Sequence, residues 1–186
     1  ELRAVGMTFE GRREIPAGWT TFRFVNASNM IHFALIDVPP AGITAEAMSE
    51  TVMQPFQDAM DAMNAGDEEA VNAAFATIPD WIGELGRNGG PGLLSAGRTG
   101  QSTVYLEPGY YIIECYVKSD GVFHTTPPAE GQLGMVMGLT VTDETSGAPE
   151  REANLNLVVR NTGFEITDGA LRAGANTIRV DFAEQQ

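Results

Sequence analysis

The chain has few of the residues that bind metals or form covalent links: one cysteine and two histidines among 186 residues. A single cysteine cannot form a disulfide within the chain, so the cysteine content does not indicate a redox compartment. No apolar run approaches the length of a membrane span. The sequence also lacks a Ser-His-Asp order, an HExxH motif and a CxxC motif. Hydrolytic catalysis therefore has no support, and we do not expect an enzyme.

Basic residues are scarce as well. Eleven Lys and Arg residues stand against 25 Asp and Glu residues, which gives a formal net charge of −14. This charge argues against nucleic acid or an anionic membrane as a partner, and it fits a protein that meets cationic partners. The hydrophobic share of 43% is that of an ordinary globular protein. The length suffices for one well-packed domain and a little more.

The chemically distinctive residues lie between positions 108 and 141, where two strand-like runs flank a loop. With the period of two that a strand imposes, the first run places on one face Tyr111, Ile113, Cys115 and Val117. The second run aligns Met135, Met137, Leu139 and Val141. The loop between the runs carries His124. A thiol, an imidazole and a thioether that come together form the ligand set of a soft metal, above all copper.

Three segments, FVNASNMIHFALI, GYYIIEC and GMVMGLTV, together resemble the cupredoxins, the family of plastocyanin-like blue copper proteins. FVNASNMIHFALI, residues 24–36, resembles their strand–Asn–loop–His–strand element, in which an Asn precedes the first His ligand by about this spacing. GYYIIEC, residues 109–115, resembles their Gly-x-Tyr-x-Phe-x-Cys strand. GMVMGLTV, residues 134–141, resembles their closing Gly-Met-x-Gly-x-x-x-Val strand, with Met137 in place of the second Gly. The resemblance covers roughly residues 1–142.

The resemblance implies an all-β fold, a Greek-key β-sandwich, with a type-1 site for one copper ion. Its trigonal ligands would be His32, Cys115 and His124. Met135 would be the weak axial ligand, with Met137 on the same face as the substitute. The resemblance further implies one-electron transfer, a basic redox protein as partner, and a mature protein that is periplasmic or secreted.

Each proposed ligand also has a structural interpretation. Cys115 fits a small core residue, because free cysteine is among the most buried residue types. His32 fits a histidine at a strand edge, and His124 fits a solvated loop histidine. Metal binding is favoured because the lone cysteine and both histidines all fall at ligand positions of the resembled fold.

The spacing of the ligands departs from that of the family. Eight residues separate Cys115 from His124, and ten separate His124 from Met135. Blue copper proteins usually have about two to four in each place. A longer loop adds only modest closure entropy, but it removes the short-loop constraint on ligand geometry. Two alternatives therefore stay open: a copper carrier or storage protein that uses the same residues, and a metal-free cupredoxin-like module that acts in protein assembly.

Residues 44–85 change character and predict an α-helical insertion into the sandwich. Thr44 and Asp67 are expected to cap its two main helices, and Pro55 to kink the first or begin a new one. Spacings of three and four predict an apolar stripe formed by Met48, Val52, Phe56, Met60 and Met63. The stripe explains the methionines of the insert, including Met53 beside it, better as core residues than as copper(I) ligands.

The last part of the sequence repeats features of the first part. A polar linker is expected at 143–153, and residues 154–186 repeat the order of features found at the start. In this alignment Gly18 corresponds to Gly174, Phe22 to Ile178 and Phe24 to Val180. We interpret this segment as the start of a second, incomplete cupredoxin-like repeat. Two or three strands alone are not stable in water, so residues 150–186 are expected to pack on the first domain, to self-associate, or to belong to a longer chain.

Overall fold

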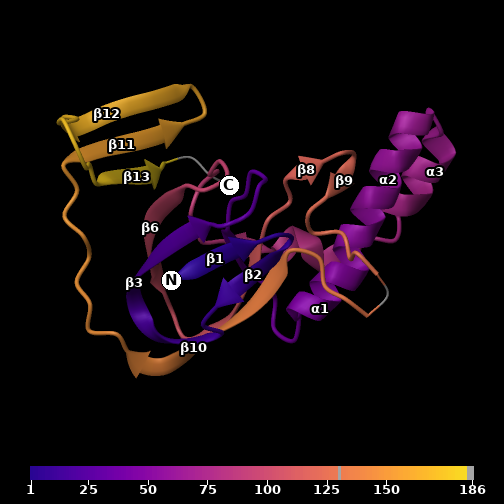
Figure 1. Ribbon diagram of the computed structural model, residues 1–186, viewed down its shortest axis with the longest axis horizontal. Helices are drawn as coiled ribbons and strands as arrows, with labels where there is room; N and C mark the ends of the chain where they lie inside the picture. Colours follow the sequence, from indigo (N-terminus) through magenta and orange to yellow (C-terminus); the bar gives the residue numbers. More distant parts are fainter. Residues whose placement is uncertain (130, 184–186) are drawn as a thin grey trace. The chain divides into compact units, whose positions relative to one another are not determined.

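The computed structural model describes residues 1–129 and 131–183 (Figure 1). The chain divides into two compact units. The first is Glu1–Ala148, and the second begins at Pro149. None of the helices in the described ranges is long and apolar enough to cross a membrane.

Two sheets make up most of the first unit, and they share one long strand, β3 (Glu14–Asn26). The first sheet consists of β2 (Thr8–Gly11), β1 (Leu2–Val5), β3 and β6 (Thr99–Leu106). The second sheet consists of the start of β3, β10 (Val136–Thr145), β7 (Gly109–Glu114), β4 (Leu35–Val38) and β5 (Gly86–Arg87). Strand β3 changes sheets at Gly18. There φ is +109°, a conformation that glycine adopts without strain.

One hydrophobic core lies between these sheets. The first sheet contributes Leu2, Phe9, Phe22 and Phe24, and the second contributes Ile36, Ile113, Met137 and Leu139. The alternation expected for residues 111–117 and 135–141 is thus observed, with one set of side chains facing inward. This arrangement confirms the predicted all-β sandwich with an α-helical insertion.

The insertion is helical from residue 45 onward. It comprises α1 (Ala45–Met48), a π-helical turn η1 (Ser49–Met53), α2 (Gln54–Ala65), α3 (Glu68–Phe75) and a 3₁₀ turn η2 (Asp80–Glu84). Both predicted caps are present, because Thr44 Oγ1 accepts the N–H of Ala47 at 3.2 Å and Asp67 Oδ1 accepts that of Ala70 at 3.0 Å. Pro55 lies at the start of α2, directly after the π-helical turn, and the helical backbone continues through it.

The first half of the insertion covers the outer face of the second sheet. Met48, Val52 and Met53 pack there against Ile112 of β7 and Val136 of β10. The predicted apolar stripe is buried only in this part, because Phe56 is 39% and Met63 54% exposed. Beyond the sheet, α2 and α3 pack mainly on each other, side by side (Figure 1). Their apolar side chains therefore have a helix rather than a sheet as their neighbour.

The remaining elements are a small hairpin and the second unit. Strands β8 (Lys118–Ser119) and β9 (Val122–Phe123) pair within the loop that follows Cys115. The second unit is a three-stranded sheet in the order β12 (Gly163–Gly169), β11 (Leu155–Arg160), β13 (Ile178–Phe182). Strand β10 continues to Thr145, so the first residues of the expected linker at 143–153 belong to a strand.

Candidate metal centre

Cys115 lies directly after β7, on the inner side of the sandwich. Its side chain is fully buried, like Ile113 two residues before it. The backbone N–H of Cys115 donates to the carbonyl of Met135 at 3.1 Å, so the end of β7 is joined to the residue that precedes β10. This pairing fixes the thiol at one end of the core.

His32 is positioned by a loop that Asn26 holds in place. The Asn26 amide donates to the carbonyls of Met30 at 2.7 Å and Leu94 at 3.0 Å, and its oxygen accepts from Ser28. His32 and Leu94 also exchange backbone hydrogen bonds, at 3.1 and 2.7 Å. The segment that carries His32 is therefore a loop held by a single bridge to Leu94, and it is followed by β4.

His124 lies in the long loop, which is well structured. The β8–β9 hairpin turns at Asp120 and Gly121, both with positive φ, and returns so that His124 N–H donates to Val117 O at 2.8 Å. Gln57 of α2 clamps the hairpin, because it accepts the N–H of Phe123 at 2.9 Å and donates to Gly121 O at 3.0 Å. The hydrogen bonds from the helical insertion and within the hairpin thus fix the position of His124, although the loop that carries it is long.

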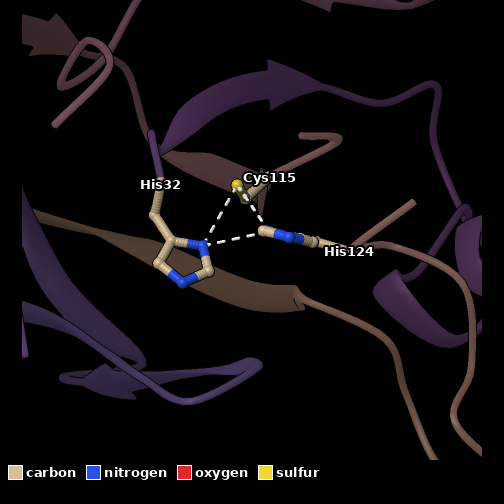
Figure 2. A group of neighbouring side chains, drawn as sticks. All are labelled: His32, Cys115 and His124. Atoms are coloured by element: carbon tan, nitrogen blue, oxygen red, sulfur yellow. Dashed lines mark hydrogen bonds between the residues drawn. The ribbon is translucent and has the colours of Figure 1, made fainter. Parts of the chain in front are cut away.

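The three side chains converge on one point (Figure 2). Cys115 Sγ lies 3.6 Å from His32 Nδ1 and 3.7 Å from His124 Nδ1, and the two Nδ1 atoms are 3.1 Å apart. A point equidistant from these three atoms is ~2 Å from each, close to metal–imidazole and metal–thiolate bond lengths of about 2.0–2.3 Å. All three residues are fully buried, and they form the one cluster of potential metal ligands among the described residues.

The outer nitrogens of the two imidazoles differ. His124 Nε2 lies 2.9 Å from Ser119 Oγ in the hairpin, which leaves Nδ1 directed at the cluster. His32 Nε2 is buried and has no hydrogen-bond partner among the described residues. The two Nδ1 atoms lie 3.1 Å apart beside the thiol. They can share one hydrogen bond in the metal-free protein, and both can bind a cation when each presents its lone pair.

Burial keeps the metal-free ligands uncharged. Desolvation, together with the neighbouring His124, lowers the pKa of His32 to about 4. The backbone of Gly6 offsets a small part of this fall. Desolvation also lowers the pKa of His124. Burial raises the pKa of the Cys115 thiol, and backbone groups of Phe33 and Val117 offset part of this rise. Neutral imidazoles are ready to bind a metal, while the thiol must lose its proton when it does.

Met135 belongs to the same buried cluster as Cys115. Its backbone N–H donates to His124 O at 2.7 Å, and its carbonyl accepts from Cys115. One backbone segment thus connects the cysteine and the second histidine, at the position where the sequence predicts an axial ligand. Met137, the substitute, is a core residue of β10.

A buried acid pair lies on the opposite face of the same sheet. Glu114 precedes Cys115 and therefore points outward, towards Asp37 of β4. Desolvation and the charge of Asp37 raise the pKa of Glu114 to about 9, and desolvation also raises that of Asp37. Arg87, 4.0 Å from Asp37, offsets this effect only in part. Glu114 consequently retains its proton at neutral pH.

Two residues of the site were not predicted from the sequence. Gln57 looked like an ordinary polar residue of a helix, and Ser119 like a residue of a loop. Helical periodicity does place Gln57 on the same side as Met53 and Met60, four residues before it and three after it, and this was the one available signal. No local pattern indicates that Ser119 would meet His124.

The chain matches no protein-family model and no curated protein. Two solved structures resemble it over 76% of its length. One is the dithionite-reduced auracyanin of the photosynthetic bacterium Roseiflexus castenholzii, with 21% identity, a TM-score of 0.39 and 94% of that chain covered. The other is auracyanin A, a "blue" copper protein of the green thermophilic photosynthetic bacterium Chloroflexus aurantiacus, with 22% identity, a TM-score of 0.41 and 95% covered. The assignment of the site rests on the geometry of this chain's own residues.

Proposed function

We propose that the first unit binds one copper ion through His32, Cys115 and His124, and that it carries single electrons. The observation that supports this most is the convergence of one sulfur and two Nδ1 atoms at a buried point. A thiolate and two imidazoles with a thioether nearby are the donors of a blue copper site, in which copper cycles between Cu(I) and Cu(II). Met135 is the proposed axial ligand.

The chain's own contribution is to hold these donors still. Cys115 is tied to Met135, His32 to Leu94, and His124 to Val117, in each case by backbone hydrogen bonds. Ligands that are fixed by two sheets and a clamped hairpin cannot rearrange much when the metal changes charge. Small rearrangement favours fast electron transfer. The burial of all three side chains excludes water from the centre.

The proposed partner is a basic redox protein. The net charge of −14 would attract such a partner and raise the rate of encounter at low salt. Ile31, which precedes His32, is 46% exposed, and Leu93, which precedes the bridging Leu94, is 64% exposed. These apolar side chains offer a contact surface close to the first histidine. An exported location, periplasmic or secreted, suits this role.

The burial of the three ligands also distinguishes an electron carrier from a protein that delivers copper. A carrier passes its ion by ligand exchange, which requires access to the ligands, whereas all three ligands here are fully buried. The geometry therefore favours electron transfer over a copper carrier or storage protein. A metal-free assembly module would have no use for two imidazole nitrogens 3.1 Å apart in a core.

Addition of Cu(II) to the metal-free protein tests the proposal. We expect saturation at one ion per chain, with an intense visible thiolate-to-copper absorption that Cys115→Ser abolishes. Ferricyanide and ascorbate should remove and restore the reduced state reversibly. Colourless binding of Cu(I) alone would favour the carrier, and no stoichiometric binding would favour the metal-free module.

A further inference from the structure

The second unit has one apolar face that its own residues leave open. The strand pairing places eight side chains on this face: Leu155, Leu157, Val159, Phe164, Ile166, Ile178, Val180 and Phe182. Of these, Phe164 is 79%, Ile166 63% and Phe182 56% exposed. The opposite face carries polar residues such as Arg179 and Asp181. An exposed apolar face of this kind marks a surface at which the sheet meets further structure.

The three strands of the second unit pair in the same pattern as three strands of the first unit. In it β1 pairs antiparallel with β2 and parallel with β3, and in the second unit β11 pairs in the same way with β12 and β13. The registers also agree, since Ala4 pairs with Phe9 as Val159 pairs with Phe164. In the first unit the free edge of β3 receives an antiparallel strand, β6. Strand β13 has no such neighbour among the described residues.

The hydrogen bonds of β13 show which backbone groups face the open edge. The carbonyl of Thr177 and the N–H of Ala183 both bond to residues of β11 or its start, namely Asn154 and Val159. Because successive residues of a strand direct their backbone groups to opposite edges, Ile178, Val180 and Phe182 direct theirs outward. An unpaired row of this kind is a template for another strand.

We propose that the occupant of this edge is β13 of a second copy of the chain, paired antiparallel about a twofold axis at Val180. Ile178 then lies opposite Phe182 of the other copy, and Val180 opposite itself. These are hydrogen-bonded pairs, and they extend the apolar face from one copy to the next. Arg179 lies opposite the second copy's Asp181 in the non-hydrogen-bonded positions, where side chains come closest.

The charges make this register self-complementary. Within one chain Arg179 Nε lies 3.2 Å from Asp181 Oδ1 and Nη1 lies 3.1 Å from Glu150, in exposed pairs that contribute little to stability. The twofold axis places the Arg–Asp pair twice in the interface, once on each side of Val180. A shift of the register by one residue would place apolar side chains on the polar face of the partner. A shift by two residues would place Arg179 or Asp181 opposite its own copy, a like-charge pair, so the pattern selects a single pairing.

Sedimentation equilibrium of the full metal-free chain tests the pairing with a charge swap. We expect the natural chain to dimerise, and Arg179→Asp or Asp181→Arg to weaken the dimer by about tenfold or more, because each variant creates two like-charge pairs. An equimolar mixture of the two variants should restore association as a heterodimer, and so should the double variant R179D/D181R. Arg172→Asp, a charge reversal in a loop of the same unit, is the matched control.

Two outcomes would overturn the proposal. One is a natural chain that stays monomeric at all concentrations. The other is a dimer that neither single charge variant weakens but that Phe164→Ser dissociates, which would show face-to-face packing instead. Circular dichroism of each variant confirms that the sheets remain folded. The copper spectrum is an independent readout, since Arg179 and Asp181 belong to the second unit.

Discussion

The side-chain oxygen of Gln57 accepts the backbone N–H of Phe123, at 2.9 Å, one residue before His124. A helix inserted more than sixty residues upstream thus holds the loop that carries the second histidine. The long loop and the helical insertion are therefore linked, because a side chain of the insertion holds the loop in place. The long loop gains from α2 the rigidity that it lacks through its own length.

Replacement of Gln57 by Ala should loosen this loop. It removes the partners of the Phe123 N–H and the Gly121 carbonyl, so we expect the free energy of unfolding to fall by about 1–3 kcal/mol. The visible absorption of the copper-loaded protein should broaden or weaken as His124 loses its fixed position. Gln54→Ala is the matched control, because the Gln54 amide bonds only to Asp58 of the same helix at 2.8 Å. Equal behaviour of the two variants would contradict the proposed clamp.

Ser119 should affect the copper affinity without serving as a ligand. Its hydroxyl lies 2.9 Å from His124 Nε2 and orients the ring. Loss of such a supporting hydrogen bond typically costs 10–100-fold in metal affinity, so we expect about this loss for Ser119→Ala. Competition with a chelator of known affinity measures it. Ser119→Thr retains the hydroxyl and should bind nearly as the natural protein does; a Thr variant as weak as the Ala variant would point to lost packing instead.

The proposed axial position can be separated from its neighbour in β10. Met135→Leu should leave copper bound but change the visible spectrum and raise or lower the reduction potential, because a weak axial ligand tunes both. Met137→Leu should leave the spectrum unchanged, since Met137 is a core residue of similar volume to its replacement. Cyclic voltammetry and absorption spectra of both variants provide the test. The assignment of Met135 fails if only the Met137 variant changes them.

The Asp37–Glu114 pair predicts a fall of stability in alkaline solution. The pKa of Glu114 is about 9 in the folded chain and near 4.5 in the unfolded chain. The folded state therefore binds the proton more tightly, and this contribution is complete below pH 4.5 and lost as the pH rises towards 9. His32, with its pKa lowered to about 4, acts in the opposite direction only below about pH 6.5.

Urea unfolding of the metal-free protein at pH 7 and pH 9 isolates the acid pair. We expect a lower free energy of unfolding at pH 9, and a clearly smaller difference in Glu114→Gln, which cannot ionise. If the free energy of unfolding falls equally from pH 7 to pH 9 in the natural protein and in Glu114→Gln, then Glu114 is not protonated in the folded protein.

The sequence predicted the inward-facing residues of the sandwich because strand alternation is a local pattern. Cys115, Met137 and Leu139 were placed on their faces correctly, and so were the caps Thr44 and Asp67. The cluster was predicted differently, from the scarcity of cysteine and histidine combined with a family resemblance. Local pattern alone could not predict that the Nδ1 atoms of His32 and His124 lie 3.1 Å apart, since the two residues are 92 positions apart in the sequence.

Contacts between elements were the part that no sequence pattern could supply. The apolar stripe of the insertion continues to Met63, but the sheet beneath it ends earlier, so its far half packs on α3 or meets solvent. The glycine-rich segment at residues 86–100 is held by contacts of this kind. The carbonyl of Pro91 accepts the Ala34 N–H at 3.0 Å, and Gly90 packs so closely on Ala34 that a Cβ would overlap its carbonyl.

The central claim is that the lone cysteine and both histidines bind one copper ion together. X-ray absorption at the copper edge of the loaded protein tests it most directly. We expect one short copper–sulfur bond and two copper–imidazole bonds, with the sulfur lost in Cys115→Ser and one imidazole lost in His124→Ala. Copper surrounded only by oxygen and exposed nitrogen donors, unchanged in these variants, would contradict it.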